Sequence, residues 1–281
     1  MPDNSLQWIK DCSGESFPWK VTSWDHLDDS GNPRAFALKY FRRGDEHPRL
    51  VEYVCASLAA DLGIGAPSVE LLTVTPDFLE SLGKLRRQPI GLAGAQAGTQ
   101  IGIAWVNAAD LARSPKALAG LANRRQPAEI IASDCYFQND DRHDSNVLVT
   151  PASIFGRPHH KLIPIDWGGS FRQRPPLPIL IEPLIGNVSL RESTRTGTLR
   201  EAVRGAEDFR DIIPRLQQLT HSSSRLRRLI SWPPGDWGVP EDVKAALLDY
   251  FLRRVDLIAE RLRRADDHEQ VFPNWQEPLA V

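Results

Sequence analysis

The sequence predicts an α+β protein of two lobes, a small mixed lobe over residues 1–106 and a mostly helical lobe over residues 107–281. Two observations lead to this prediction. The first hundred residues alternate short β-branched or aromatic runs with turn signals, which is typical of strands and hairpins. From Asn107 onward, apolar residues recur mainly at helical spacing. A chain of 281 residues suits one large domain or two lobes that share a cleft.

The small lobe is expected to begin with a hairpin and to contain one long helix. Apolar residues between Pro48 and Leu62 recur near the helical period, and Gly63, Gly65 and Pro67 stop the pattern. In chain order, the expected elements are strand 18–24, turn 29–32, strand 35–41, helix 48–62, strand 69–74, loop 91–98 and strand 101–106.

The second lobe is expected to be built from helices around a short strand pair. Pro127 suits the first position of a helix. The expected elements are helix 127–137, strands 147–149 and 161–165, an irregular proline-rich segment 172–187, and helices 206–219, 223–230 and 240–264. The last helix has one apolar stripe, interrupted by Arg254, which we interpret as core packing.

Composition excludes several classes of protein. The net charge of -2, with 25% charged residues, leaves no electrostatic footprint for nucleic acid or an anionic membrane. The basic runs 225–228 and 261–264 are interpreted as solvated helix faces. Three widely spaced cysteines without a C-x-x-C pair favour reduced thiols over disulfides or zinc. No signal peptide or long apolar run is found, so we expect a cytoplasmic protein that meets no membrane and meets nucleic acid only through a partner protein.

The most informative segment is the run 137–148, in which Asp141 lies five positions before Asn146. A second apolar run, 162–165, is followed by Asp166 and two glycines. Phosphoryl transfer needs such a set: one carboxylate for the proton of the attacking hydroxyl, and an amide and a second carboxylate for Mg²⁺. Asp140 lies six positions from Asn146 and misses this spacing. A turn former or helix cap is the alternative reading of Asp166.

Contacts with phosphates are expected from the small lobe. Lys39 lies in a predicted strand, and Glu52 on the following helix could pair with it; a solvent-facing lysine is the alternative. The turn Ser13-Gly14-Glu15-Ser16 is a candidate phosphate clamp through its backbone N–H groups. In the catalytic segment, a hydrogen bond that stabilises the loop is the favoured role of His143, with a phosphate contact as the alternative. Arg142 and Asp144 are expected to be structural.

At these residues the chain resembles the HipA-like kinases, bacterial members of the protein-kinase-like superfamily. Phosphoinositide kinases share the Asp-Arg-His-x-x-Asn order. In the first hundred residues the strand lysine and the helix that carries Glu52 agree with the resemblance, which extends over about residues 12–260. The residues that carry it are Asn139-x-Asp141-Arg142-His143-x-x-Asn146 and Ile165-Asp166-Trp167-Gly168.

The resemblance implies a bilobal protein-kinase-like fold and an ATP- and Mg²⁺-dependent phosphotransferase. Residues 1–106 would bind the nucleotide, and residues 107–281 would hold the catalytic loop and metal site. The implied roles are catalytic base for Asp141, Mg²⁺ ligands for Asn146 and Asp166, phosphate binding for Lys39 with Glu52, a phosphate turn for Ser13, Gly14 and Ser16, a phosphate or loop contact for His143, and adenine contacts through the backbone of Trp105 and its neighbours.

Two features depart from the usual kinase pattern: no G-x-G-x-x-G loop is present, and no Ala-Pro-Glu follows Asp166. The expected acceptor is a serine or threonine of a protein substrate or of the chain itself. The alternatives are a kinase-shaped nucleotide-binding or toxin–antitoxin module with little turnover, and a kinase of a small-molecule or lipid hydroxyl. A solvated loop is the favoured reading of the polar stretch downstream of Asp166, and self-phosphorylation is the alternative; its candidate sites are Ser189, Ser193, Thr194, Thr196 and Thr198.

Overall fold

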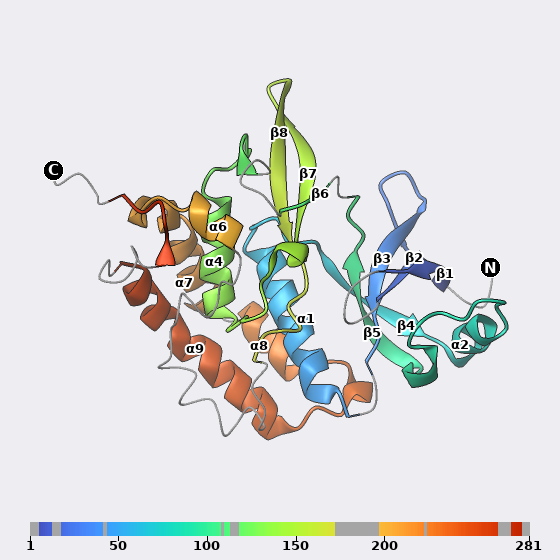
Figure 1. The fold of residues 1–281 in the computed structure, drawn as a ribbon. Coiled ribbons are helices and arrows are strands. Elements are labelled where there is room, and N and C mark those ends of the chain that lie inside the picture. Colours follow the sequence, from blue (N-terminus) through green and yellow to red (C-terminus); the bar gives the residue numbers. More distant parts are fainter. Residues whose placement is uncertain are drawn as a thin grey trace. The chain divides into compact units, whose positions relative to one another are not determined.

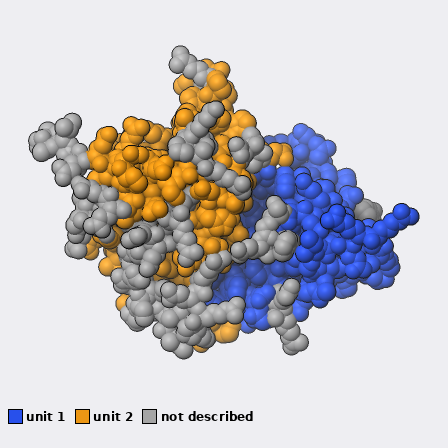
Figure 2. All heavy atoms as spheres, in the orientation of Figure 1, with its two compact units in different colours: residues 1–53, 67–106, 233–239 blue, residues 54–66, 107–232, 240–281 orange. Residues whose placement is uncertain are grey.

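The computed structural model describes residues 6–12, 18–41, 44–107, 110–112, 118–171, 197–221, 224–263 and 271–276. The chain forms two compact units (Figure 2). Unit 1 comprises Met1–Tyr53, Pro67–Val106 and Pro233–Val239, and unit 2 comprises Val54–Ala66, Asn107–Trp232 and Pro240–Val281. Neither unit is one continuous piece of chain, because helix α1 (Glu46–Asp61) is divided between them and the short segment Pro233–Val239 belongs to unit 1.

Unit 1 is built on a five-stranded antiparallel sheet in the order β1-β2-β3-β5-β4 (Figure 1). The predicted hairpin and the two later strands are confirmed, with shifted ends, whereas β1 and helix α2 were not predicted. The strands are β1 (Leu6–Asp11), β2 (Trp19–Leu27), β3 (Pro33–Lys39), β4 (Val69–Val74) and β5 (Gly98–Ala104).

Alternation along the strands explains the core of unit 1. Trp19 and Val21 on β2 and Phe36 and Leu38 on β3 are buried, because alternate side chains on a strand share one face. Helix α2 (Pro76–Gly83) adds Phe78 and Leu82 to this core, and its N-cap Thr75 accepts a hydrogen bond from the Phe78 N–H. The short helix η1 (Leu92–Gly94) lies in the predicted loop.

Unit 2 is mostly helical, as predicted, and α4 is buried along its whole length. Its α-helices are α4 (Gln126–Tyr136), α6 (Gly197–Ala202), α7 (Ile212–His221), α8 (Ser224–Ser231) and α9 (Glu241–Arg263). Two short 3-10 helices accompany them, η2 (Asp144–Asn146) and η3 (Ala206–Phe209). A third, η4 (Gly235–Trp237), belongs to unit 1. The proline-rich segment 172–187 lies outside the described residues. No helix among the described ranges is both long and apolar enough to cross a membrane.

A small antiparallel sheet in unit 2 has the order β6-β7-β8. Its strands are β6 (Asp110–Leu111), β7 (Val147–Ile154) and β8 (Arg157–Pro164). The β7–β8 hairpin is longer than the predicted strand pair and extends beyond the rest of unit 2 (Figure 1). Its base matters for the site, because β7 begins directly after Asn146 and β8 ends two residues before Asp166.

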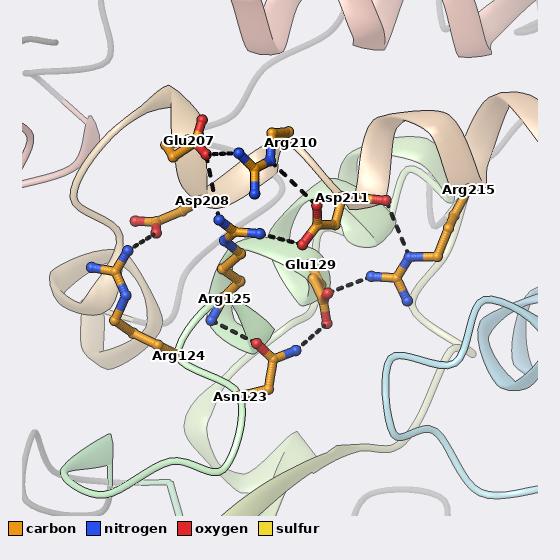
Figure 3. Close-up of polar contacts among 9 residues, drawn as sticks. All are labelled: Asn123, Arg124, Arg125, Glu129, Glu207, Asp208, Arg210, Asp211 and Arg215. Carbon is orange, nitrogen blue, oxygen red and sulfur yellow. Dashed lines mark hydrogen bonds and ion pairs between the residues drawn. The ribbon is translucent and has the colours of Figure 1, made fainter.

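The N-terminal end of α4 is anchored by an ion-pair network (Figure 3). Arg125 pairs with Asp211 and Glu207, and Glu129 pairs with Arg215. Arg215 also donates to the carbonyl of Leu62, at the end of α1. These contacts fix α4 to η3, to α7 and to the half of α1 that belongs to unit 2. The residues drawn are Asn123, Arg124, Arg125, Glu129, Glu207, Asp208, Arg210, Asp211 and Arg215.

Candidate functional site

The loop after α4 carries the predicted base, and its backbone is held from within the fold. Gln138 opens the loop in the left-handed region, at φ 49°. Asn139 is fully buried; its amide nitrogen donates to Asp134 Oδ1 at 3.0 Å, and its amide oxygen accepts from the Asp141 N–H at 3.2 Å. A buried amide that is bonded on both sides has little freedom to rotate. The backbone of Asp141 is therefore fixed by α4.

Arg142 is the central support of this part of unit 2. Its guanidinium is completely buried and forms a bidentate pair with Asp134, with Nε–Oδ2 and Nη2–Oδ1 distances of 3.0 Å. Nη1 donates to the carbonyl of Asn146 at 2.9 Å and to the carbonyl of Ile165. The same group lies 4.4 Å from the centre of the Trp167 ring. One side chain thus connects α4, the end of the loop that carries Asp141, and the residue before Asp166.

Burial and pairing shift the pKa of Asp134 in opposite directions. Burial raises the pKa of the Asp134 carboxyl, while Arg142 and Asn139 lower it by stabilising the anion. Such an ion pair costs desolvation energy and becomes favourable only when its hydrogen bonds are satisfied. The role of Asp134 was not predicted from the sequence. Its signal is that Glu129 and Asp134 are the two charged residues of a helix that is buried along its whole length.

Asn146 ends the loop with its amide nitrogen engaged and its amide oxygen available. The nitrogen donates to the carbonyl of Asp141 at 3.2 Å and lies 3.1 Å from Nε2 of His143. The amide oxygen accepts no hydrogen bond from the described residues. His143 therefore contacts the loop itself, in the arrangement expected of a loop-stabilising residue; a phosphate contact stays a prediction.

Asp166 follows β8 with a left-handed backbone, at φ 61°, and its Oδ1 accepts from the Gly168 N–H at 3.3 Å. It forms part of a turn, which does not prevent it from binding a metal. A Cβ at Gly169 would lie 2.4 Å from Cβ of Asp141, so this turn packs directly against the catalytic loop. The bridge between Asn139 and Ser170 adds a second contact. Unit 2 thus brings Asp141, Asn146 and Asp166 onto adjoining loops.

The donor set of these loops fits Mg²⁺. The amide oxygen of Asn146 and the carboxylate of Asp166 are hard oxygen ligands, which Mg²⁺ prefers. Within the described ranges, no group of three or more His, Cys, Asp or Glu side chains could hold a metal ion. Mg²⁺ in nucleotide sites takes only one or two protein ligands and completes its shell with phosphates and water, so the set suffices.

In unit 1 the predicted Lys39–Glu52 ion pair is present. The Nζ–Oε1 distance is 2.7 Å, and the two side chains are 11% and 1% exposed. Lys39 is the last residue of β3, and Glu52 lies on α1. The alternative of a solvent-facing strand lysine is therefore wrong. A buried carboxylate needs its cation, so the pair holds the lysine in one place. Its contact with a phosphate stays a prediction.

Trp105 follows β5, and its backbone is partly engaged. Its N–H donates to the carbonyl of Ala35 at 2.9 Å, which continues the β3–β5 ladder, so this N–H is not available to adenine. The ammonium group of Lys20 lies 4.2 Å from the centre of the Trp105 ring, and that of Lys10 lies 5.8 Å away. The next residue, Val106, forms no hydrogen bond with the described residues, and its contact with adenine stays a prediction.

Other predicted positions lie outside the described residues. These are Ser13, Gly14 and Ser16 of the expected phosphate turn, and Ser189, Ser193, Thr194 and Thr196 among the expected phosphorylation sites. Thr198 is described; it is 7% exposed on α6. Its side chain is therefore buried in a helix, and its phosphorylation stays a prediction.

Comparison with known proteins identifies the fold. No protein-family model matches the sequence, and no curated protein matches it. A solved structure that is similar is that of CtkA, a proinflammatory kinase of Helicobacter pylori. The TM-score is 0.52 and the sequence identity 11%, over 92% of this chain and 95% of that chain. The predicted bilobal α+β, kinase-like fold is thereby confirmed, whereas the narrower resemblance to HipA-like kinases stays a proposal.

Proposed function

We propose that the protein is an ATP- and Mg²⁺-dependent phosphotransferase of the HipA-like type, which transfers the γ-phosphate to a serine or threonine hydroxyl of a protein. The observation that carries this proposal is the buried guanidinium of Arg142. It binds the carbonyls of Asn146 and Ile165, and so fixes the residues that carry both candidate metal ligands. A pure binding module needs no general base, whereas this chain has Asp141 in the loop that ends at Asn146, packed against the turn that follows Asp166.

The residues divide the reaction among them. The acceptor oxygen forms a bond to the γ-phosphorus, and the bond between that phosphorus and the β–γ bridging oxygen breaks, which releases ADP. Asp141 takes the proton of the hydroxyl. Asn146 and Asp166 would hold Mg²⁺ through oxygen atoms. When bound, Mg²⁺ neutralises charge on the phosphates. Lys39, held by Glu52, would bind the α- and β-phosphates.

A protein acceptor is favoured over a lipid headgroup by charge. A lipid kinase must approach an anionic surface, which attracts clusters of lysine and arginine. This chain carries 34 basic and 36 acidic residues, so it has no net attraction to such a surface. The acceptor could lie on another protein or on a second copy of this chain.

The test compares Asp141→Asn with the matched control Asp140→Asn, one residue earlier in the same loop. Purified proteins are incubated with γ-labelled ATP and Mg²⁺, alone, with cell lysate and with phosphoinositide vesicles. We expect Asp141→Asn to lose ~10²–10⁴-fold in transfer while it still binds ATP, because general-base contributions have this size. Asp140→Asn should transfer at close to the wild-type rate.

Equal rates for wild type and Asp141→Asn would refute the role of this carboxylate. Asp166→Ala serves as a second arm, in which ATP affinity is measured with and without Mg²⁺. We expect the Mg²⁺-dependent gain in affinity to disappear, because the carboxylate joins metal to protein. Labelled lipid without any modified protein hydroxyl would exclude a protein kinase.

A further inference from the structure

The segment Pro233–Val239 belongs to unit 1, although it connects two helices of unit 2, α8 and α9. It contains η4, and we call it the η4 segment. In Figure 1 the η4 segment, drawn in orange, lies beside the first turns of α1, drawn in blue. Nothing in the proposed mechanism uses it. It nevertheless contacts α1, which carries Glu52, and β5, which pairs with the strand that carries Lys39.

Its first contact is with the edge of β5. Asp236 Oδ2 accepts from the Thr99 N–H at 2.6 Å, and Trp237 Nε1 donates to the Thr99 carbonyl at 2.9 Å. Two side chains thus satisfy both backbone groups of one strand residue. Gly98 is required here, because its φ is +124° and a Cβ would lie 2.7 Å from Asp236 Oδ2.

This contact continues the ladder that contains Lys39. β3 pairs with β5 only as far as Lys39 and Ile101. Backbone groups of residues two apart on a strand point to the same side, so those of Thr99 face the edge that β3 has just left. The η4 segment therefore occupies that edge immediately beyond Lys39.

Its second contact is with the face of α1 that neighbours Glu52. The Trp237 ring is 1% exposed and meets the ring of Tyr53 edge to face, at 5.5 Å between centroids. The guanidinium of Arg49 lies 5.6 Å from the centre of the Trp237 ring. Arg49 and Tyr53 are one helical turn apart and lie on either side of Glu52 in the sequence.

Arg49 is buried where it contacts Trp237, which stabilises the contact between α1 and the η4 segment. Arg49 is 6% exposed, and its Nη2 donates to the carbonyl of Phe41 at 3.3 Å. Burial lowers the pKa of the Arg49 guanidinium, and the negative charge of Asp236 opposes that shift. Aromatic and cation–π contacts of this kind each contribute about 0.5–2 kcal/mol.

We propose that the η4 segment is a latch that holds α1 against β5, and that Trp237 and Asp236 position Glu52 for Lys39. This proposal rests on the proposed function, since its purpose is to keep Lys39 ready for ATP. A Lys–Glu hydrogen bond of 2.7 Å is lost once its atoms separate by about 1 Å. A small displacement of α1 is therefore enough to break this hydrogen bond.

The test uses Trp237→Ala and the milder Asp236→Ala, which removes the acceptor of the Thr99 N–H from an exposed position. The matched control is Trp232→Ala, because Trp232 lies in the same stretch of chain but is 80% exposed. Each change is made in the wild type and in a Glu52→Gln background. For each protein, kcat and KM for ATP, ATP affinity and urea midpoint are measured.

We expect Trp237→Ala to lower kcat/KM for ATP by ~10–10²-fold, the loss that follows from a misplacement of about 1 Å. Asp236→Ala should give a smaller loss in the same direction, and Trp232→Ala none. In the Glu52→Gln background, Trp237→Ala should lower kcat/KM for ATP by less than about twofold, because its effect passes through Glu52. Trp237→Ala should lower the urea midpoint by the same amount in both backgrounds. This result separates an effect on the position of Glu52 from an effect on folding.

Two results would overturn the latch. One is an unchanged kcat/KM for ATP in folded Trp237→Ala and Asp236→Ala. The other is a loss of kcat/KM from Trp237→Ala that is as large in the Glu52→Gln background as in the wild type. Wild-type protein that neither binds nor turns over ATP would instead overturn the proposed function. Hydrogen exchange then decides on the latch alone. Trp237→Ala should reduce amide protection over residues 46–53, and unchanged protection would refute the contact with α1.

Discussion

Replacement of Arg142 by methionine should destabilise the fold severely, because it leaves the Asp134 carboxylate buried without a cation. Both side chains are 0% exposed in the native structure. Loss of one partner of a buried ion pair costs about 3–5 kcal/mol. The carbonyls of Asn146 and Ile165 also lose their donor, at ~1–3 kcal/mol for each that stays buried. Against a total stability of roughly 5–15 kcal/mol, such a variant lies near the limit of folding.

The loss of stability in Arg142→Met should depend on pH in a defined direction. Burial already raises the pKa of Asp134, and the variant lacks the cation that opposes this shift. A carboxyl whose pKa is raised in the folded state binds a proton more readily there than in the unfolded chain. Its destabilising effect is therefore absent below the unfolded pKa of about 3.9 and grows as pH rises through the folded value. We expect a smaller deficit at acidic pH than at pH 8.

The assay is urea unfolding followed by circular dichroism at several pH values, with Lys84→Met as the control. Lys84 pairs with Glu80 at 2.6 Å on the surface of the molecule, where the side chains are 72% and 66% exposed. An exposed pair at this spacing contributes only ~0.3–0.5 kcal/mol. A midpoint for Arg142→Met as high as that of the control would refute the argument.

A double variant, Arg142→Met with Asp134→Leu, separates stability from positioning. Removal of both charges should recover part of the lost stability, because no ion remains buried unpaired. Phosphate transfer should not recover, since the carbonyls of Asn146 and Ile165 still lack the guanidinium. Full recovery of transfer would show that Arg142 has no part in positioning the loops.

Two further changes test single backbone positions. Phe155→Asn should stabilise unit 2 by up to about 1 kcal/mol, because Phe155 is fully exposed at φ 48° and asparagine adopts the left-handed region at lower cost; a lower urea midpoint would contradict this. Gly169→Ala should reduce phosphate transfer strongly, because the new Cβ would meet Asp141 at 2.4 Å, whereas Gly83→Ala, with no atom within 4 Å, should leave transfer unchanged; equal transfer by the two variants would refute the steric argument.

The sequence predicted those parts of the site that depend on local spacing. Lys39 and Glu52 lie on consecutive elements with strong periodicity, so their pairing could be expected, and the structure has it. The interval from Asp141 to Asn146 likewise lies within one loop. The base of the β7–β8 hairpin was predicted but its length was not, because polar and proline residues beyond Val149 obscure the alternation.

Long-range contacts of buried polar groups were not predicted. Periodicity reports which face of an element is buried, but not which distant backbone group it meets. Trp237 could be expected in a core, yet nothing in its neighbourhood points to Thr99, which lies far earlier in the chain. The engaged N–H of Trp105 was missed for the same reason, since the ladder with β3 continues past the apolar run that marks the strand.

Arg254 shows what such residues contribute. It interrupts the apolar stripe of α9, and it is completely buried. Its guanidinium donates to the Cys135 carbonyl from Nε at 3.0 Å and to the Gln138 side-chain oxygen from Nη2 at 2.6 Å. Arg142 does the same at the other end of the loop, at the carbonyl of Asn146. A guanidinium offers several donors in one fixed plane, which a lysine cannot. The loop that carries Asp141 is thus held at both ends by buried arginines, so their cost in desolvation is offset by a fixed position for the carboxylate.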